Sequence, residues 1–174
     1  MKKQINVVGA VIVKDGEILC AQRGDVASLA GMWEFPGGKI EPGETPQGAL
    51  QREIGEELRC EVRVGERVES TAHEYDFGVI TLTTYYCELL AGTPLLNEHA
   101  AVRWLAPDDL TILEWAPADV PAVERIRADF AVPGHKSPPG QTSGSPRLRL
   151  PDSLHGHCSR SESSAPNKLP LCRS

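Results

Sequence analysis

Three glutamates, Glu53, Glu56 and Glu57, stand close together in a stretch whose apolar residues recur at every fourth position. If that stretch is a helix, its residues are about 100° apart, so the three carboxylates share one face and border the buried stripe. Like charges one turn apart repel by roughly a few tenths of a kcal/mol per pair when exposed, and by more near the core. The pattern therefore indicates either a solvated acidic face or a site for a hard divalent cation such as Mg²⁺, which binds carboxylate oxygens and substrate phosphates.

Neighbouring residues favour the cation site. Arg52 can offset one of the charges by pairing with Glu56 at the next turn, but it cannot offset all three. Upstream, Gly37 and Gly38 let the backbone come close to a ligand, and a carbonyl group there could complete a metal shell. A glycine pair alone is typical of a structural turn, whereas the pair followed by glutamates at this spacing indicates a metal site.

Local patterns predict the elements that must position these residues. A helix is expected to begin at Pro46, with Thr45 as its N-cap and with Leu50, Ile54 and Leu58 as its buried stripe. A turn or short helix is expected at 107–110 and a closing helix within 117–130, and the segment between the second strand and the first helix should be a loop. Runs rich in apolar and β-branched residues predict strands at 6–13, 18–22, 60–64, 66–74, 79–89 and 101–105. These elements predict a mixed β-sheet with at least two helices in an α/β layered domain.

The charge of the chain is unevenly distributed. Its 174 residues include 18 Lys and Arg and 24 Asp and Glu, but residues 133–174 hold six of the basic residues and only two of the acidic ones. Residues 1–132 are left with 12 basic and 22 acidic residues, a net charge of −10. Nucleic acid needs Lys and Arg to neutralise its phosphates, so we expect no nucleic-acid partner.

Composition also predicts how the chain is divided. The length and the 40% hydrophobic content favour a single domain, which we place at 1–132. Residues 133–174 contain seven Pro, nine Ser and four Gly but no Phe, Trp or Tyr, which predicts a disordered C-terminal tail.

The cysteines and the hydropathy pattern favour a cytoplasmic protein. Cys20, Cys60 and Cys87 have apolar or strand-like neighbours, so we expect buried free thiols in a reducing compartment. We find no secretion signal, and no apolar run reaches the roughly 20 residues that a membrane helix needs, so no membrane partner is expected.

The spacing from Gly38 through Glu44 and Arg52-Glu53 to Glu56-Glu57 resembles the Nudix box of hydrolases that cleave nucleoside diphosphates linked to another moiety. The resemblance extends over about residues 5–130, and "LAGMWEFPGGKIEPGET" is similar to MutT-type members and to the bacterial CTP pyrophosphohydrolases. It implies a Nudix α/β/α sandwich that converts a nucleoside triphosphate to its monophosphate and pyrophosphate.

One position differs from the family pattern, because Arg59 stands where the family usually has a glycine after the box helix. A side chain in a left-handed C-cap costs about 1 kcal/mol of stability.

The resemblance also implies roles for particular residues. The metal is expected to be Mg²⁺, for which Mn²⁺ could substitute. Arg52 would orient the cluster by pairing with a carboxylate, Glu44 would support it indirectly, and either Glu53 or Glu98 would be the general base. The implied metal ligands are the carbonyl group of Gly37 and the carboxylates of Glu53, Glu56, Glu57 and Glu98.

Other positions match the family's substrate contacts. Arg23 and Lys39 match phosphate-contacting positions, and Asp119 in "WAPADVP" lies where the family lines its base pocket. Without the family, Asp119 would equally suit a helix N-cap. An ionised carboxylate only accepts hydrogen bonds, so it should face the donors of cytosine or guanine. Phe35 and Trp33 could stack on a base, although aromatic residues beside the box are more often core.

The sequence thus predicts a metal-dependent pyrophosphohydrolase that acts on (d)CTP, on oxidised or modified nucleotides such as 8-oxo-dGTP, or on both, as a monomer or homodimer that cleans the nucleotide pool. One alternative is a Nudix enzyme for another substrate, such as ADP-ribose or capped RNA, against which the MutT-like loop and the acidic surface argue. The other is an inactive binding module of the same fold. The box glutamates, which such modules often lose, are all present here and favour the enzyme.

Overall fold

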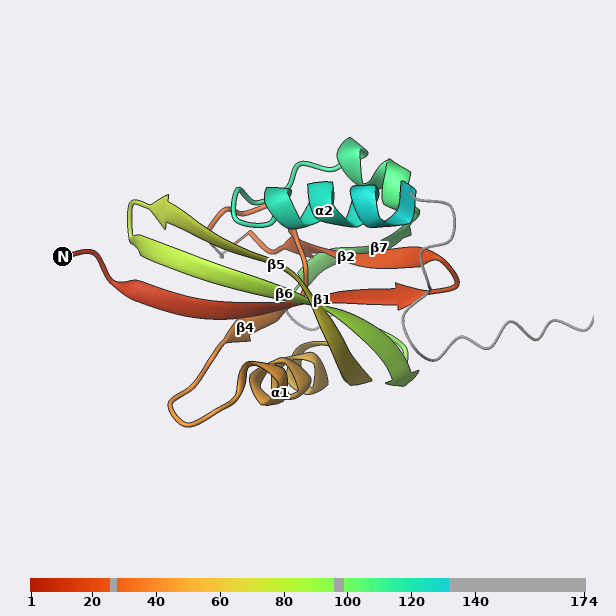
Figure 1. Ribbon diagram of the computed structural model, residues 1–174, viewed down its shortest axis with the longest axis horizontal. Coiled ribbons are helices and arrows are strands. Elements are labelled where there is room, and N and C mark those ends of the chain that lie inside the picture. The colour runs from red at the N-terminus through yellow and green to blue at the C-terminus, as the bar shows by residue number, and fades with distance from the viewer. Residues whose placement is uncertain (26–27, 96–98, 132–174) are drawn as a thin grey trace, which may run out of the picture. The chain divides into compact units, whose positions relative to one another are not determined.

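A mixed β-sheet forms the centre of the computed structural model, which describes residues 1–25, 28–95 and 99–131 (Figure 1). The main strand order is β3-β2-β1-β6-β5, with β4 paired to β1 and β7 paired to β2. Strand β1 runs parallel to β6 and antiparallel to β2, so the predicted mixed sheet is confirmed. The strands are β1 (Gln4–Lys14), β2 (Glu17–Arg23), β3 (Trp33–Glu34), β4 (Gly37–Lys39), β5 (Glu61–Tyr75), β6 (Gly78–Ala91) and β7 (His99–Leu105).

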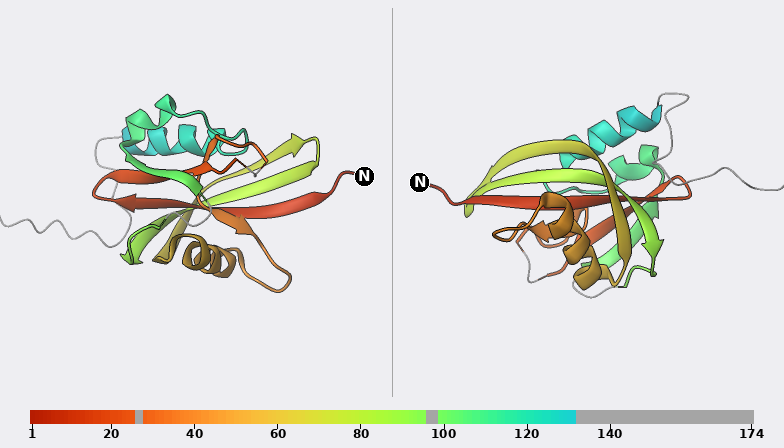
Figure 2. Two further views of the ribbon diagram at one scale, coloured as in Figure 1. Left: turned by 180° about the vertical axis from the view of Figure 1, so that it is seen from behind. Right: turned by 60° about the horizontal axis from the view of Figure 1, so that its bottom comes forward.

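Helices cover both faces of the sheet. Helix α1 (Pro46–Leu58) lies on one face and α2 (Val120–Ala131) on the other, preceded by a 3-10 helix at Pro107–Ile112 (Figures 1 and 2). This arrangement confirms the α/β/α sandwich.

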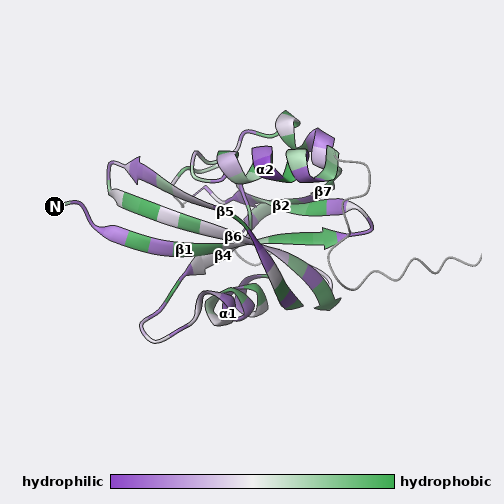
Figure 3. Ribbon diagram, in the orientation of Figure 1, coloured by the Kyte–Doolittle hydropathy of each residue, from purple (hydrophilic) through white to green (hydrophobic). Residues whose placement is uncertain are grey.

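Strand β1 separates the two hydrophobic cores. Val8 and Ile12 pack in the cluster that contains α1, whereas Val11 and Val13 pack in the cluster that contains α2. Because both faces of β1 are covered, its residues 7–13 form a continuous apolar run instead of an alternating one, and most of its C-terminal half is hydrophobic (Figure 3).

Helix α1 begins and ends where local signals predict. The Oγ1 atom of Thr45 accepts a hydrogen bond of 3.1 Å from the backbone N–H of Gly48, and Pro46 is the first helical residue. The predicted stripe, Leu50, Ile54 and Leu58, is fully buried. The helix ends at Arg59, which adopts a left-handed conformation with φ 56° and ψ 35°. Glu53, Glu56 and Glu57 lie beside this buried stripe on the helix and are not themselves buried.

Two predictions about strands were wrong. The strands expected at 60–64 and 66–74 form one strand, β5, because shifts of register against β6 between Val64 and Glu69 absorb the irregular residues. The loop expected before α1 contains the short strands β3 and β4. Their pairings with β2 and β1 join residues distant in sequence, so local composition does not reveal them.

Other expectations have mixed outcomes. Cys20, Cys60 and Cys87 are buried free thiols, as predicted. Within the described ranges, none of the helices has the length and apolar character needed to span a bilayer. The disordered tail predicted at 133–174 lies outside the described residues.

Replacing Arg59 by glycine should raise the free energy of unfolding by roughly 1 kcal/mol, because glycine adopts the left-handed conformation without the clash of a Cβ atom. Urea unfolding of the wild type and Arg59→Gly measures the difference. Arg59→Ala is the matched control, since it keeps the Cβ atom and should bring no gain. Equal gains in both variants would assign the effect to the lost side chain instead of the backbone.

Candidate functional site

A pocket of about 450 Å³ opens beside β1, β4 and β6. Apolar side chains such as Val8, Ile80 and Leu82 form part of its wall. Seven residues singled out by the sequence also line it, namely Arg23, Phe35, Gly37, Gly38, Lys39, Glu57 and Asp119. The fold thus brings the glycine pair, the acidic helix and the "PAD" segment to one cavity.

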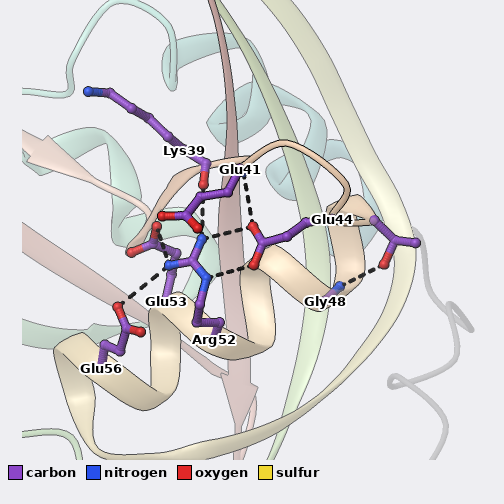
Figure 4. Close-up of polar contacts among 8 residues, drawn as sticks. Lys39, Glu41, Glu44, Gly48, Arg52, Glu53 and Glu56 are labelled. Carbon is purple, nitrogen blue, oxygen red and sulfur yellow. Dashed lines mark hydrogen bonds and ion pairs between the residues drawn. The ribbon is translucent and has the colours of Figure 1, made fainter.

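Arg52 is the centre of a carboxylate network beside this pocket (Figure 4). Its Nε and Nη2 atoms donate to the two carboxylate oxygens of Glu44 at 2.7 and 2.9 Å. Its Nη1 atom lies 3.0 Å from Oε1 of Glu53 and 3.5 Å from Oε2 of Glu56. The predicted ion pair between Arg52 and Glu56 is therefore present, but the bidentate ion pair with Glu44 has shorter distances.

The network also holds the segment before α1. Nη2 of Arg52 donates to the carbonyl oxygen of Lys39 at 3.2 Å, and the backbone N–H of Glu41 donates to Glu44 at 3.0 Å. The hydrogen bond from Arg52, helped by that from Glu41, lowers the pKa of Glu44 to about 2. Glu44 is therefore ionised at neutral pH and anchors the guanidinium group, which fits the supporting role implied by the family.

The glycine pair makes room for two different neighbours. A Cβ atom on Gly38 would lie 2.3 Å from Cδ of Glu53 and 2.4 and 2.6 Å from its two oxygens. A Cβ atom on Gly37 would lie 2.1 Å from the carbonyl oxygen of Val8. Gly38 thus lets the Glu53 carboxylate lie against β4, whereas Gly37 lets β4 pair closely with β1.

The donor atoms at this end of the pocket suit a hard divalent cation. The Glu53, Glu56 and Glu57 carboxylates and the Gly37 carbonyl group offer only oxygen, which Mg²⁺ prefers. Among the described residues, no three acidic, His or Cys side chains are gathered as a preformed metal cluster. Arg52 is the partner of Glu53 and Glu56 here, so these side chains would turn from it to hold a cation. Glu98, the fifth predicted ligand, lies outside the described residues.

Asp119 also lines this pocket. Its side chain is buried, and Oδ1 accepts a hydrogen bond of 3.0 Å from the backbone N–H of Phe35. The carboxylate thus bonds across to the segment between β3 and β4 instead of capping α2. Burial, aided by the nearby charge of Glu34, raises the pKa of Asp119 to about 8, against the effects of Phe35 and Arg23. The assumption of an ionised carboxylate needs correction, because at neutral pH this group can also donate a hydrogen bond.

Of the two cations predicted to bind phosphate, Arg23 has partners for its side chain within the protein. Arg23 forms an ion pair with Glu34, and its Nε donates to the carbonyl oxygen of Ser28 at 2.6 Å. Glu34 in turn lies 3.4 Å from Nε2 of His99. The Lys39 side chain extends away from the Arg52 network (Figure 4). Arg23 therefore presents a partly compensated charge to the pocket, and the compensating Glu34 was not predicted from sequence.

The aromatic residues have different positions. Phe35 lines the pocket and packs against Trp115 with a ring-centroid distance of 4.7 Å. Trp33 belongs to the core on the α2 side, with Arg103 5.3 Å over its ring, so the expectation that it stacks on a base is not supported.

Two further aromatic residues, Tyr75 and Phe77, also line the pocket and were missed. Tyr75 ends β5 and Phe77 lies in the two-residue turn before β6, and aromatic residues at and next to a hairpin turn were the available signal.

Known proteins are similar to this chain over the domain that contains the pocket. The family model described as the NUDIX domain matches residues 7–125. The CTP pyrophosphohydrolase of Escherichia coli (strain K12) is 43% identical over 126 residues, which cover 72% of this chain and 93% of that protein. The putative 8-oxo-dGTP diphosphatase 2 of Mycobacterium tuberculosis (strain ATCC 25618 / H37Rv) is 43% identical over 122 residues, which cover 68% and 84%. The solution structure of the DNA mismatch repair protein MutT from methicillin-resistant Staphylococcus aureus 252 has 55% identity and a TM-score of 0.63, and the match covers 74% of this chain and 98% of that one.

The two glycines should respond differently to substitution. Gly37→Ala should lower the free energy of unfolding by roughly 2 kcal/mol, because its Cβ collides with backbone that cannot move freely. Gly38→Ala should cost less, since the colliding Glu53 carboxylate ends a flexible side chain, but it should weaken Mn²⁺ binding. Urea unfolding and Mn²⁺ titration measure the two effects. Equal destabilisation with unchanged Mn²⁺ affinity would contradict this division.

The raised pKa of Asp119 predicts a dependence of stability on pH. Between pH 4 and 8 the folded state keeps a proton that the unfolded state releases, so the free energy of unfolding should fall as pH rises. The slope contributed by one group is at most about 1.4 kcal/mol per pH unit. Asp119→Asn keeps an acceptor for Phe35 and should flatten this part of the profile. Parallel profiles for both proteins in urea unfolding from pH 5 to 8.5 would refute the assignment.

Proposed function

Because the chain belongs to the Nudix hydrolase family, we propose that it is a Mg²⁺-dependent pyrophosphohydrolase that acts on (d)CTP, on oxidised or modified deoxynucleoside triphosphates such as 8-oxo-dGTP, or on both. The family generally uses divalent metal ions and acts on small nucleotides. One observation carries the proposal: a single pocket is lined both by Glu57 of α1 and by the buried carboxyl group of Asp119. Phosphates and base can therefore be bound in the same cavity.

The pocket suits a nucleotide in size and polarity. Its volume of about 450 Å³ lies within the usual range for small-molecule sites, roughly 300–1,000 Å³. Apolar side chains of β1 and β6 can cover the faces of a base, while Asp119 meets its polar edge. Arg23 and Lys39 supply positive charge in an otherwise acidic domain, which favours phosphate contacts.

The residues of α1 would assist hydrolysis at the phosphate end. When bound, Mg²⁺ lowers the pKa of a water molecule and neutralises phosphate charge. Glu53 can accept the proton of the attacking water, because Gly38 gives the carboxylate room beside β4. Glu98 remains the alternative base. Before a cation binds, Arg52 would limit the repulsion between Glu53 and Glu56.

Pyrophosphate release tests the proposal directly. CTP, dCTP, 5-methyl-dCTP, dGTP and 8-oxo-dGTP would each be assayed with Mg²⁺, with Mn²⁺ and with excess chelator. Metal-dependent release would support the enzyme, and the ranking of kcat/KM would identify the preferred base. Release from none of them, with turnover of ADP-ribose or capped RNA, would favour another Nudix substrate. Binding without turnover of any would favour the binding module.

Glu53→Gln should lower kcat by roughly 10²–10⁴-fold, the usual contribution of a general base, while leaving the fold intact. The amide can still bond to Arg52 but cannot take a proton at neutral pH. Glu124→Gln, an exposed glutamate of α2, is the matched control and should keep wild-type kcat. If Glu53→Gln keeps most of its activity at an unchanged Tm, Glu53 is not the base.

A further inference from the structure

The hydroxyl group of Tyr75 lies next to the residue expected to read the base. It accepts a hydrogen bond of 3.1 Å from the backbone N–H of Ala118, directly before Asp119 in the chain. All three residues line the same pocket. A phenolic hydroxyl has one proton to donate besides its acceptor positions. Because Ala118 is the donor in this bond, the Tyr75 proton remains available, and the part of the chain that the structure describes provides no acceptor for it.

The ring of Tyr75 is held in place by its neighbours. Phe77 stacks on it with a centroid distance of 5.2 Å and an interplanar angle of 5°, and His73 packs against it at 4.6 Å. Burial and the nearby Asp119 raise the pKa of Tyr75, so the hydroxyl keeps its proton at neutral pH. The donor is therefore fixed before a ligand enters, which lowers the entropic cost of using it.

Asp119 has a matching arrangement. Its Oδ1 is bound to the backbone N–H of Phe35, and the described residues give Oδ2 no hydrogen-bond partner. Tyr75 and Asp119 thus each have one atom bonded to the protein backbone and further hydrogen-bonding capacity in the pocket.

We propose that Tyr75 is a second base-binding residue, whose hydroxyl donates to an acceptor on the base next to the group bound by Asp119. The inference rests on the proposed function for its ligand, a nucleotide. Cytosine offers a ring nitrogen beside its exocyclic amine, and guanine offers a carbonyl oxygen beside its ring N–H. Both present the required acceptor beside a donor, so the experiment must distinguish them.

A purely structural role for the hydroxyl predicts a different result. If it only held Ala118, its removal would disturb the pocket equally for every nucleotide. If it donates to the base, its removal matters only for bases that carry the acceptor, which a double-mutant cycle between protein and ligand detects.

The test measures Kd by calorimetry, in Mg²⁺, for wild type and Tyr75→Phe with two ligand pairs. CMP is compared with 3-deaza-CMP, which lacks the ring nitrogen acceptor, and GMP with 6-thio-GMP, whose sulfur accepts weakly. For the base that is read, Tyr75→Phe should weaken the parent nucleotide by roughly 3- to 10-fold and leave the analogue nearly unchanged. Equal weakening of parent and analogue in both pairs, or no weakening, would overturn the proposal.

Tyr86→Phe is the matched control, because its hydroxyl bonds to Asp129 at 2.9 Å and Tyr86 does not line the pocket. It should change none of these affinities.

The binding cycle also separates this inference from the proposed function. If Tyr75→Phe and the base analogue are coupled in binding but no pyrophosphate is released, the proposed activity is refuted and Tyr75 remains a base-binding residue. If pyrophosphate is released but the two changes are not coupled, the activity is supported and the role of Tyr75 is refuted.

Discussion

The guanidinium group of Arg52 joins helix α1, the loop before it and strand β4, and it limits the repulsion between the carboxylates there. It binds both oxygens of Glu44 in the loop before α1, the carbonyl group of Lys39 in β4, and the carboxylates of Glu53 and Glu56 on the helix itself. One delocalised charge with five donors can do this, whereas a lysine ammonium could not match so many directions. The rest of this network depends on that arrangement, because Arg52 holds the helix, the loop and β4 together.

The parts that sequence predicted are those set by local rules. Thr45, Pro46 and the stripe of Leu50, Ile54 and Leu58 define α1 without reference to the rest of the chain, and the spacing of the glutamates follows from that helix. The buried run of β1 likewise indicated a strand, and the resemblance to the Nudix family supplied the sandwich and the pocket residues.

The parts that sequence did not predict depend on partners far away in the chain. Strands β3 and β4 exist because β2 and β1 pair with them, and β5 is continuous because β6 tolerates its bulges. The protonation of Asp119 follows from burial, which composition does not give. Tyr75 was overlooked because its importance comes from Ala118, 43 residues later. The features that sequence did not predict therefore depend on tertiary contacts between elements, whereas helix α1 and strand β1 follow from local sequence.

The part of the pocket around Asp119 is assembled from segments about 80 residues apart. Trp33 exchanges backbone hydrogen bonds with Glu114 and Ala116, and Phe35 bonds to Asp119. On the ribosome, the glutamate helix therefore emerges well before the wall that completes its pocket, and at about 5–20 residues per second the delay is several seconds. A nascent chain would present its acidic face before residues 114–119 could complete the pocket. Under the proposed function, nucleotide selectivity would therefore arise later in synthesis than the metal-binding face.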